Sequence, residues 1–329
     1  MPSYFIRQGP ALCRATRQTN IMVEYQPIVT MPLFSVIIAV YNDWIALDLC
    51  LRSLAQQTQG PSFEVIVVDD GSSEAVPQGI HRWVSSFPLT IVKQSHSGVS
   101  TARNRGIRAS KGSILVFVDA DCRVQTNCFA ALNSTITDSP EHDCFQLRLA
   151  GDCSTLVGRA EELRFTSFQT HMVQSSGCIR YLNTAGFAIR RAKADVDSGL
   201  FDGCALRGED TLLLAKLMRY GKLPLFVPDA VVQHCVSLSL LGYLRKSVRS
   251  AYLERRAYDI IRSKGVRIRM THRERLRMLF YMWRTSGNQT IGRQAWFVLT
   301  VKQALQRIVS VTCRCLRIRP KPPISTNPP

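Results

Sequence analysis

The chain has 329 residues, a hydrophobic fraction of 46% and a formal net charge of +18. This length allows one large domain or one domain with an appendage, and no uninterrupted apolar run is long enough to span a bilayer. The eleven cysteines include no Cys-x-x-Cys pair, which argues against a disulfide framework or a zinc site and favours reduced thiols in the cytoplasm.

Strands and helices are predicted to alternate in the first part of the chain. Runs of β-branched and other apolar residues predict the strands, and apolar residues at helical spacing predict the helices. We expect strands at 34–40, 63–68, 89–93 and 114–118, and helices at 44–54, 81–87 and 99–109. Such alternation predicts an α/β fold with a mostly parallel sheet.

The pattern becomes looser after residue 121. We expect helices at 127–136 and 211–220, and strands at 145–149, 183–190, 225–227 and 230–233. Residues 1–32 are expected to be a flexible extension, with Met31 as the functional start. Residues 235–319 are expected to be a basic helical region, and the proline-rich residues 320–329 a disordered tail.

Two aspartates follow the strand predicted at 114–118. Side chains at positions i and i+2 of an extended segment share a face, so Asp119 and Asp121 can bind one ion. Their carboxylates suit Mg²⁺ or Mn²⁺, and the carboxyl ends of strands are where open α/β sheets bind ligands. The alternative is that Asp-x-Asp is a common sequence at strand ends and turns.

Five short motifs occur in a fixed order along the chain. They are Val40-Tyr41-Asn42, Asp69-Asp70-Gly71-Ser72, Ala102-Arg103-Asn104-Arg105-Gly106, Asp119-Ala120-Asp121 and Gly208-Glu209-Asp210. Together they resemble the family 2 glycosyltransferases of the GT-A fold, over residues 33–234. The resemblance implies a Rossmann-like catalytic domain there, which transfers a sugar from a nucleotide-diphosphate donor.

The resemblance assigns the donor site to the first three motifs. Val40 and Tyr41 would lie against the nucleotide base, and Asp70 would accept a hydrogen bond from uracil or thymine. Arg103 would pair with the donor diphosphate, whereas Asn104 could instead hold the loop. Alternatively, Tyr41 packs on the sheet and Asp70 caps an Asp-Gly turn.

The resemblance assigns a metal site to the next motif. Asp119 would contact the ribose or the metal, and Asp121 would bind the metal directly. His234 would supply a third contact to the metal or the diphosphate, although an isolated histidine is usually structural. The metal would neutralise the diphosphate as the bond to the sugar breaks.

The last motif is assigned to the acceptor. Asp210 would be the general base that takes the proton of an acceptor hydroxyl, and Glu209 would orient that acceptor. Inversion at the sugar requires in-line attack from the face opposite the diphosphate. The alternative is that both acids only favour the positive end of a helix.

We therefore expect an inverting, metal-dependent glycosyltransferase that uses a UDP-sugar and a lipid-linked or cell-envelope glycan acceptor. Gln294-Ala295-Trp296 does not match the Gln-x-x-Arg-Trp motif of processive synthases in this family, which favours transfer of single sugars. The alternatives are a retaining GT-A transferase and a non-catalytic scaffold that binds membrane or nucleic acid.

The basic charge is concentrated in residues 235–329, which hold 20 Lys and Arg against three Asp and Glu. Apolar residues recur there at helical spacing among arginines, for example Leu276, Phe280 and Trp283. Such helices suit an anionic membrane surface, and the chain is expected in the cytoplasm or on the inner membrane face. The alternative is that the apolar stripes dock on the catalytic domain. No recognition motif supports nucleic acid.

Overall fold

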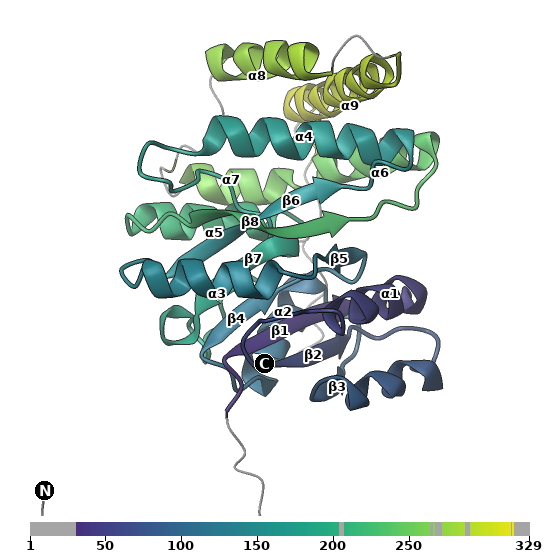
Figure 1. Cartoon of the computed structure of the whole chain (residues 1–329). Helices are drawn as coiled ribbons and strands as arrows, with labels where there is room; N and C mark the ends of the chain where they lie inside the picture. The colour runs from purple at the N-terminus through teal and green to yellow at the C-terminus, as the bar shows by residue number, and fades with distance from the viewer. Residues whose placement is uncertain are drawn as a thin grey trace, which may run out of the picture. The chain divides into compact units, whose positions relative to one another are not determined.

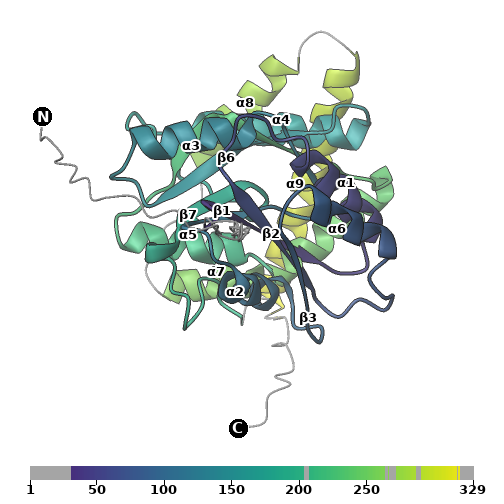
Figure 2. The ribbon, with the colours of Figure 1, turned by 60° about the horizontal axis from the view of Figure 1, so that its bottom comes forward.

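The computed structural model describes residues 31–203, 207–263, 266, 272–286, 290–316 and 318. Within them, eight strands form one sheet in the order β3-β2-β1-β4-β7-β6-β8-β5, with helices on both faces (Figures 1 and 2). The α/β fold predicted from the sequence is confirmed. The predictions for residues 1–30 and 319–329 lie outside the described residues.

The first part of the chain follows the predicted alternation. Its elements are β1 (Phe34–Val40), α1 (Trp44–Leu54), β2 (Phe63–Asp69), η1 (Gln78–Ser85), β3 (Leu89–Lys93), α2 (Val99–Ala109), β4 (Ile114–Phe117), β5 (Cys122–Val124) and α3 (Cys128–Asp138). The helix predicted at 81–87 is the 3-10 segment η1. Strands β1 to β4 pair in parallel, so their carboxyl ends meet at one edge of the sheet.

The second part of the chain completes the sheet and adds most of the helices. Its elements are β6 (Cys144–Gly151), α4 (Leu156–Met172), η2 (Thr184–Gly186), β7 (Phe187–Arg190), η3 (Arg191–Lys193), α5 (Glu209–Arg219), β8 (Leu225–His234), α6 (Leu240–Leu253), α7 (Arg255–Ser263), α8 (His272–Thr285) and α9 (Thr290–Cys315). Strand β7 is antiparallel to β4 and β6, and β5 is antiparallel to β8, so the sheet is mixed.

Three predictions in this part need correction. The strand predicted at 183–190 begins only at Phe187, because the Asn183 side chain accepts a hydrogen bond from the Ala185 amide and holds a 3-10 turn. The two short strands predicted around Pro228 are one strand, β8, whose register shifts at that point. Helix α4 was not predicted, because its buried face carries polar side chains such as Gln169.

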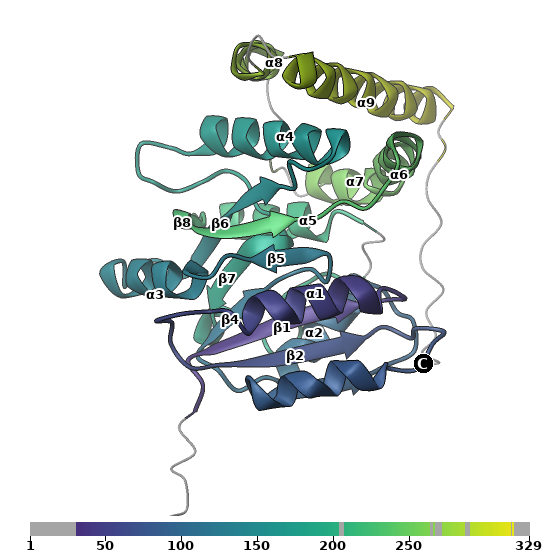
Figure 3. The same ribbon diagram turned by 45° about the vertical axis from the view of Figure 1, so that its right-hand side comes forward.

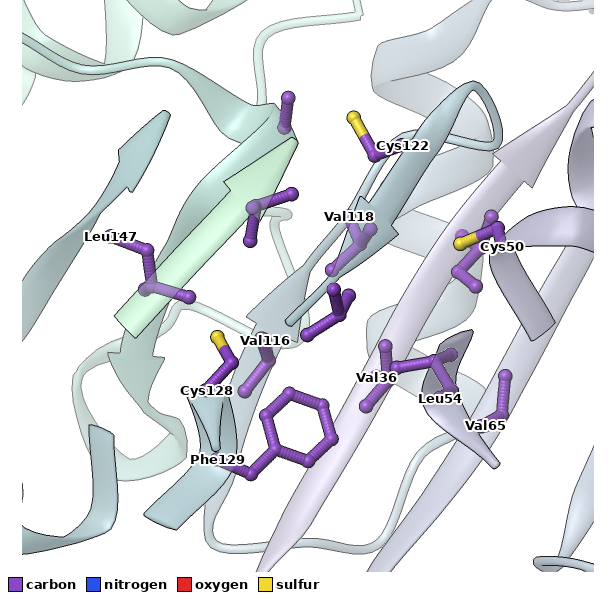
Figure 4. Close-up of a cluster of buried hydrophobic side chains, with 14 of the residues drawn as sticks. Val36, Cys50, Leu54, Val65, Val116, Val118, Cys122, Cys128, Phe129 and Leu147 are labelled. Carbon is purple, nitrogen blue, oxygen red and sulfur yellow. The ribbon is translucent and has the colours of Figure 1, made fainter. Parts of the chain in front are cut away.

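Apolar side chains cover both faces of the sheet. Alternate residues of β1 point to opposite sides: Val36 and Ile38 join α1 and α3 in one cluster, and Ile37 joins α2 and α5 in another. Figure 4 shows part of the first cluster, where Val36, Val116 and Phe129 come from different elements. Burial of both faces explains why the strands are continuous apolar runs.

The basic C-terminal region docks on the rest of the chain. Helices α8 and α9 lie along α4 (Figures 1 and 3), and Met278, Met282 and Val298 join Val157 and Ala160 in one buried cluster. The helices dock, as the structural alternative predicts, but they do so through Met278, Met282 and Val298, whereas the stripe of Leu276, Phe280 and Trp283 is exposed. Within the described part of the chain, no helix combines the length and apolar character needed to cross a bilayer.

A buried charge network fixes α9 to α4. The Lys302 Nζ donates to Glu161 Oε1 at 3.0 Å and to the Tyr243 hydroxyl at 2.7 Å. Burial lowers the Lys302 pKa to about 8, although Glu161 opposes this shift. Glu161 also pairs with Arg164 on its own helix and accepts a hydrogen bond from the Tyr243 hydroxyl on α6. Its carboxylate therefore joins α4, α6 and α9.

We expect the substitution Lys302→Met to lower the free energy of unfolding by about 1–3 kcal/mol, because it removes the two hydrogen bonds that the buried Lys302 ammonium donates. Urea unfolding monitored by circular dichroism measures the change. Lys111→Met, at an exposed lysine, is the matched control and should change it little. Equal stability of the two variants would show that the Lys302 contact does not fix the helix.

Candidate active site

The parallel strands bring three of the predicted motifs to one edge of the sheet. Strands β2 and β4 both pair with β1, so the segments after Val40, Asp69 and Phe117 are neighbours. The Asp70 amide donates to the Val40 carbonyl at 2.9 Å and joins the first two of these segments. This edge is where open α/β sheets bind ligands.

The Asp70 carboxylate holds the loop that leads into α2. It accepts hydrogen bonds from the Ser97 amide at 2.8 Å, the Gly98 amide at 2.9 Å and the Gln94 side chain at 2.7 Å. Only 3% of Asp70 is exposed. Asp70 therefore holds this loop rather than capping the Asp-Gly turn, which was the alternative predicted for it, and a contact to a base stays a prediction.

The turn after β2 depends on a glycine. Gly71 has φ +79°, and a Cβ there would lie 2.5 Å from the His96 amide nitrogen, so another residue would strain the turn. The neighbouring Asp69 supports this turn, because its carboxylate accepts a hydrogen bond from the Ser72 amide at 2.8 Å. The turn is in turn tied to β1, because the Ser72 hydroxyl accepts from the Asn42 amide.

Tyr41 and His96 form a stacked aromatic pair at the same edge. Their ring centroids are 4.3 Å apart with planes 27° from parallel, and Tyr41 is 49% exposed. Tyr41 therefore does not pack into the core, whereas the Val40 side chain does. His96 was not predicted to be a site residue. The only sequence feature that indicated such a role is its position two residues before Gly98, the N-cap of α2.

Arg103 on α2 joins two of the predicted site residues. Its guanidinium donates to Asp119 Oδ1 at 2.6 Å and to Glu209 Oε1 at 2.8 Å, and the side chain is 3% exposed. Burial opposes its charge, but the two carboxylates outweigh burial and raise its pKa. The phosphate contact expected of Arg103 stays a prediction, because both Arg103 contacts shown here are carboxylates.

Asn104 holds a loop, which was one of the two roles predicted for this segment, and the other arginines of α2 face solvent. The Asn104 side chain donates to the Phe201 carbonyl at 2.8 Å and accepts from the Phe201 amide at 3.0 Å, so it holds that loop. Arg105 and Arg108 are exposed. Arg103 is thus the one arginine of this helix that reaches the site.

Asp121 faces His234 across the pairing of β5 with β8. Their closest side-chain atoms, Oδ2 and Nε2, are 3.4 Å apart, and Asp121 is about one third exposed. Burial alone would raise the Asp121 pKa, but the contact with His234 lowers it. His234 Nδ1 is buried without a hydrogen-bond partner, so this imidazole is held by packing and by Asp121.

The donor set at this position fits a divalent cation. Ligands about 2.1 Å from an ion and at right angles to each other are about 3 Å apart, close to the separation of Asp121 and His234. Asp119 lies two residues away but is turned to Arg103. Among the described residues, no three acidic, His or Cys side chains already form a complete metal site.

Glu209 and Asp210 begin α5. Gly208 precedes them with φ +87° and leaves space for Ala257, since a Cβ on Gly208 would lie 3.1 Å from that side chain. Burial, followed by repulsion from Glu209 and Glu254, raises the Asp210 pKa to about 7. The Glu209 pKa is lowered instead, because Arg103 outweighs burial. The two neighbouring carboxylates therefore differ in basicity.

A profile of the family described as Glycosyl transferase family 2 matches residues 35–199, half of the chain. The chain belongs to this family. The match covers the motifs at Val40, Asp69, Arg103 and Asp119 and ends before Glu209. The family assignment made from the motifs is therefore confirmed.

Named relatives in the family match only part of their length. Glycosyltransferase AglE of Haloferax volcanii is 36% identical over 96 residues, which is 28% of this chain and 32% of AglE. Validoxylamine A glucosyltransferase of Streptomyces hygroscopicus is 38% identical over 92 residues, 27% of this chain and 20% of the relative. The chain thus aligns with at most about a third of these relatives.

A solved structure extends the similarity of fold beyond the family profile. The mannosyltransferase PcManGT from Pyrobaculum calidifontis, in complex with GDP-Man and Mn²⁺, superposes with a TM-score of 0.59 at 16% identity. The similarity covers 88% of this chain and 89% of PcManGT. This supports the GT-A fold over most of the chain, including part of its C-terminal region.

We expect Arg103→Met to destabilise the fold by about 3 kcal/mol, because it leaves Glu209 largely buried with no positive partner. Adding Glu209→Gln should recover part of this loss, since the unpaired charge is then removed. Urea unfolding of the wild type, both single variants and the double variant measures the coupling. Additive effects would contradict a direct Arg103–Glu209 pair.

Proposed function

We propose that this chain is an inverting, metal-dependent glycosyltransferase that moves one sugar from a UDP-sugar to an acceptor hydroxyl. The observation that carries the proposal is the Arg103 bridge. It ties Asp119, at the end of a central strand, to Glu209, at the start of α5. The residues that would bind the donor, near Asp119, and those that would bind the acceptor, near Glu209, would therefore be held at a fixed distance and orientation, as in-line attack requires.

Asp121 and His234 would hold a divalent cation, and Asp119 would complete the set or contact the donor ribose. When bound, the cation neutralises charge on the diphosphate leaving group. The carboxylates of Asp119 and Asp121 are each about one third exposed, so both are accessible to a ligand. The donor set of two carboxylates and one imidazole supports Mn²⁺ or Mg²⁺.

Tyr41 and Asp70 would bind the donor base. The exposed face of the stacked Tyr41 ring offers a surface for a planar base. The Asp70 carboxylate accepts hydrogen bonds from Gln94, Ser97 and Gly98 and lies 3.0 Å from His96 Nδ1, which together use its roughly four acceptor positions. The imide N–H of uracil would therefore have to replace one of these contacts.

Asp210 would act as the general base, with Glu209 positioning the acceptor. A raised pKa makes Asp210 a better proton acceptor than an ordinary aspartate near neutral pH. Glu209 has its charge fixed by Arg103, so its role would be to orient groups rather than to exchange protons. This division of roles follows from the different partners of the two side chains.

The direct test is a donor screen with the full chain, several UDP-sugars and GDP-mannose in the presence of Mn²⁺. We expect release of nucleoside diphosphate, and a loss of about 100-fold or more in Asp121→Ala. Asp229→Asn, at an exposed aspartate, is the control. Absence of release with every donor would contradict the proposal, and NMR of the product's anomeric proton would separate inversion from retention.

The pH dependence of kcat/KM should report Asp210. Since a base must be unprotonated, kcat/KM should rise about tenfold per pH unit below a pKa of about 7 and level off above it. Glu209→Gln removes a repelling charge, so the rising limb should move to lower pH. Initial rates at saturating metal across the pH range measure this. If kcat/KM of the Asp210→Asn variant rose with pH over the same range as in the wild type, Asp210 would be excluded as the base.

Tyr41→Ala should weaken donor binding by about tenfold with little change in kcat, because it removes one stacking surface remote from the bond that breaks. Tyr41→Phe keeps the ring and should bind the donor nearly as well as the wild type. Titration of the nucleoside diphosphate by calorimetry measures both variants. Equal affinity of all three proteins would place the base elsewhere.

A further inference from the structure

Helices α8 and α9 each have apolar side chains on two opposite faces. The inner faces pack against α4 in the buried cluster described above. The outer faces carry large exposed side chains, which we call the outer apolar face: Leu276 (66% exposed), Phe280 (66%) and Trp283 (48%) on α8, and Phe297 (63%), Ile308 (60%) and Val311 (48%) on α9. A helix that is apolar all round needs a second apolar neighbour.

The outer residues of α8 form one stripe. Leu276, Phe280 and Trp283 are four and three residues apart, so they share a face of the helix. Met278 and Met282 are buried, and each is about 200° around the helix from Leu276 and Phe280 respectively. The exposed stripe is therefore on the side of α8 that points away from the inner cluster.

The outer residues of α9 continue the same surface. Phe297 and Val311 are about 21 Å apart along the helix, with Ile308 between them on the same face. The opposite face carries Ala295 and Leu299, which pack inward. Figure 3 shows both helices on the same side of α4. Because their inner faces pack against α4, both outer stripes are directed away from it.

An open groove extends the apolar surface toward α6. It has a volume of about 490 Å³ and is lined by Leu156, Leu240, Phe297 and Val298, with Arg293 and Gln294 at its edge. Leu240 and its neighbour Leu241 are 42% and 57% exposed. The first turn of α6 thus adds leucines beside the Phe297 end of the outer apolar face.

Arginines border the stripe on α8. Arg273, Arg277 and Arg284 are exposed and lie within four residues of Leu276 or Phe280, and on a helical projection all three fall on one flank. In the described part of the chain, none of the three forms an ion pair with an acidic side chain. The whole segment 235–329 has 20 basic against three acidic residues.

This combination of groups selects the partner. Apolar side chains and an indole, bordered by arginines, match the boundary between lipid chains and anionic headgroups. A second copy of this chain would bring like charges together, which opposes association. Nucleic acid would pair with the arginines but would leave most of the leucine and phenylalanine surface in water.

We propose that the outer apolar face binds the surface of an anionic lipid bilayer, with Phe280, Trp283 and Phe297 inserted at the level of the headgroups. This interaction goes beyond the proposed transferase function and does not depend on it. It also narrows the sequence-based hypothesis from the whole basic region to the outer faces of α8 and α9, with the exposed leucines of the first turn of α6 beside them.

The test is co-sedimentation of the full chain with lipid vesicles. Vesicles of phosphatidylcholine alone are compared with vesicles in which about one third of the lipid is phosphatidylglycerol. We expect at least about tenfold stronger binding to the anionic vesicles, because each arginine near the surface contributes several-fold. Raising the salt concentration from about 0.05 M to about 0.5 M should weaken this binding.

Paired variants locate the surface. The double substitution Phe280→Glu and Phe297→Glu should reduce binding to anionic vesicles by at least about tenfold. Val84→Glu is the matched control, because Val84 is 56% exposed and lies on η1. Segment η1 packs beside β3, the first strand in the sheet order, whereas α4 packs on β6, which is near the other end of that order. The far-ultraviolet circular dichroism of all variants should match the wild type, and so should donor turnover without lipid.

Three results would overturn the proposal. The first is that the wild type does not sediment with anionic vesicles, or that the double variant sediments equally well. The second is that single-stranded DNA binds wild type and double variant alike while vesicles bind neither. The third is that light scattering shows a dimer that the double substitution dissociates, with no vesicle binding. Donor turnover is measured separately, so loss of the transferase proposal would not be confused with these results.

Discussion

The ion pairs of Arg103 are the interaction on which the rest of the site depends. The guanidinium is 3% exposed, and Asp119 and Glu209 compensate the cost of burying its charge. These partners are 16 and 106 residues away in sequence, so one side chain fixes α2, the end of β4 and the start of α5 together. The same contact separates the two acids of α5: it holds Glu209 ionised, and the charge of Glu209 adds to the effect of burial in raising the pKa of Asp210. Arg103 on α2 thus influences the charge of both acids at the start of α5.

A second clamp positions the helix that carries this arginine. The Asp70 carboxylate accepts the amides of Ser97 and Gly98, so the end of β2 holds the first residues of the segment that becomes α2. The same loop carries His96, which stacks on Tyr41 from the end of β1. Three strand ends and one helix therefore form a connected unit. Because each link is a hydrogen bond or ring contact of a few ångströms, displacement of one element would displace its neighbours.

Local patterns in the sequence predicted the parts of this unit that depend on nearby residues. The continuous apolar strands, the range of α2 and the order of the acidic motifs were all readable, because burial of both sheet faces and strand-end turns leave local signatures. The partners of Arg103 could not be predicted from the sequence, because an ion pair between residues 106 positions apart leaves no local pattern. Helix α4 was missed because its buried face carries polar side chains, among them Glu161 and Gln169, whose partners come from the C-terminal helices and from β6 respectively.

The C-terminal helices are linked to His234, and through it to Asp121, by contacts that run through α4. Lys302 of α9 pairs with Glu161, Glu161 pairs with Arg164, and the Arg164 guanidinium lies 4.2 Å from the centre of the Phe165 ring. The Phe165 ring in turn meets His234 edge to face, with centroids 6.0 Å apart. Removing everything after His234 would expose the apolar cluster on α4 and take Lys302 from Glu161, so loss of activity on truncation would not show that the basic region is catalytic. Substitutions confined to the outer faces of α8 and α9 leave this chain of contacts intact, so they can separate surface binding from support of the site.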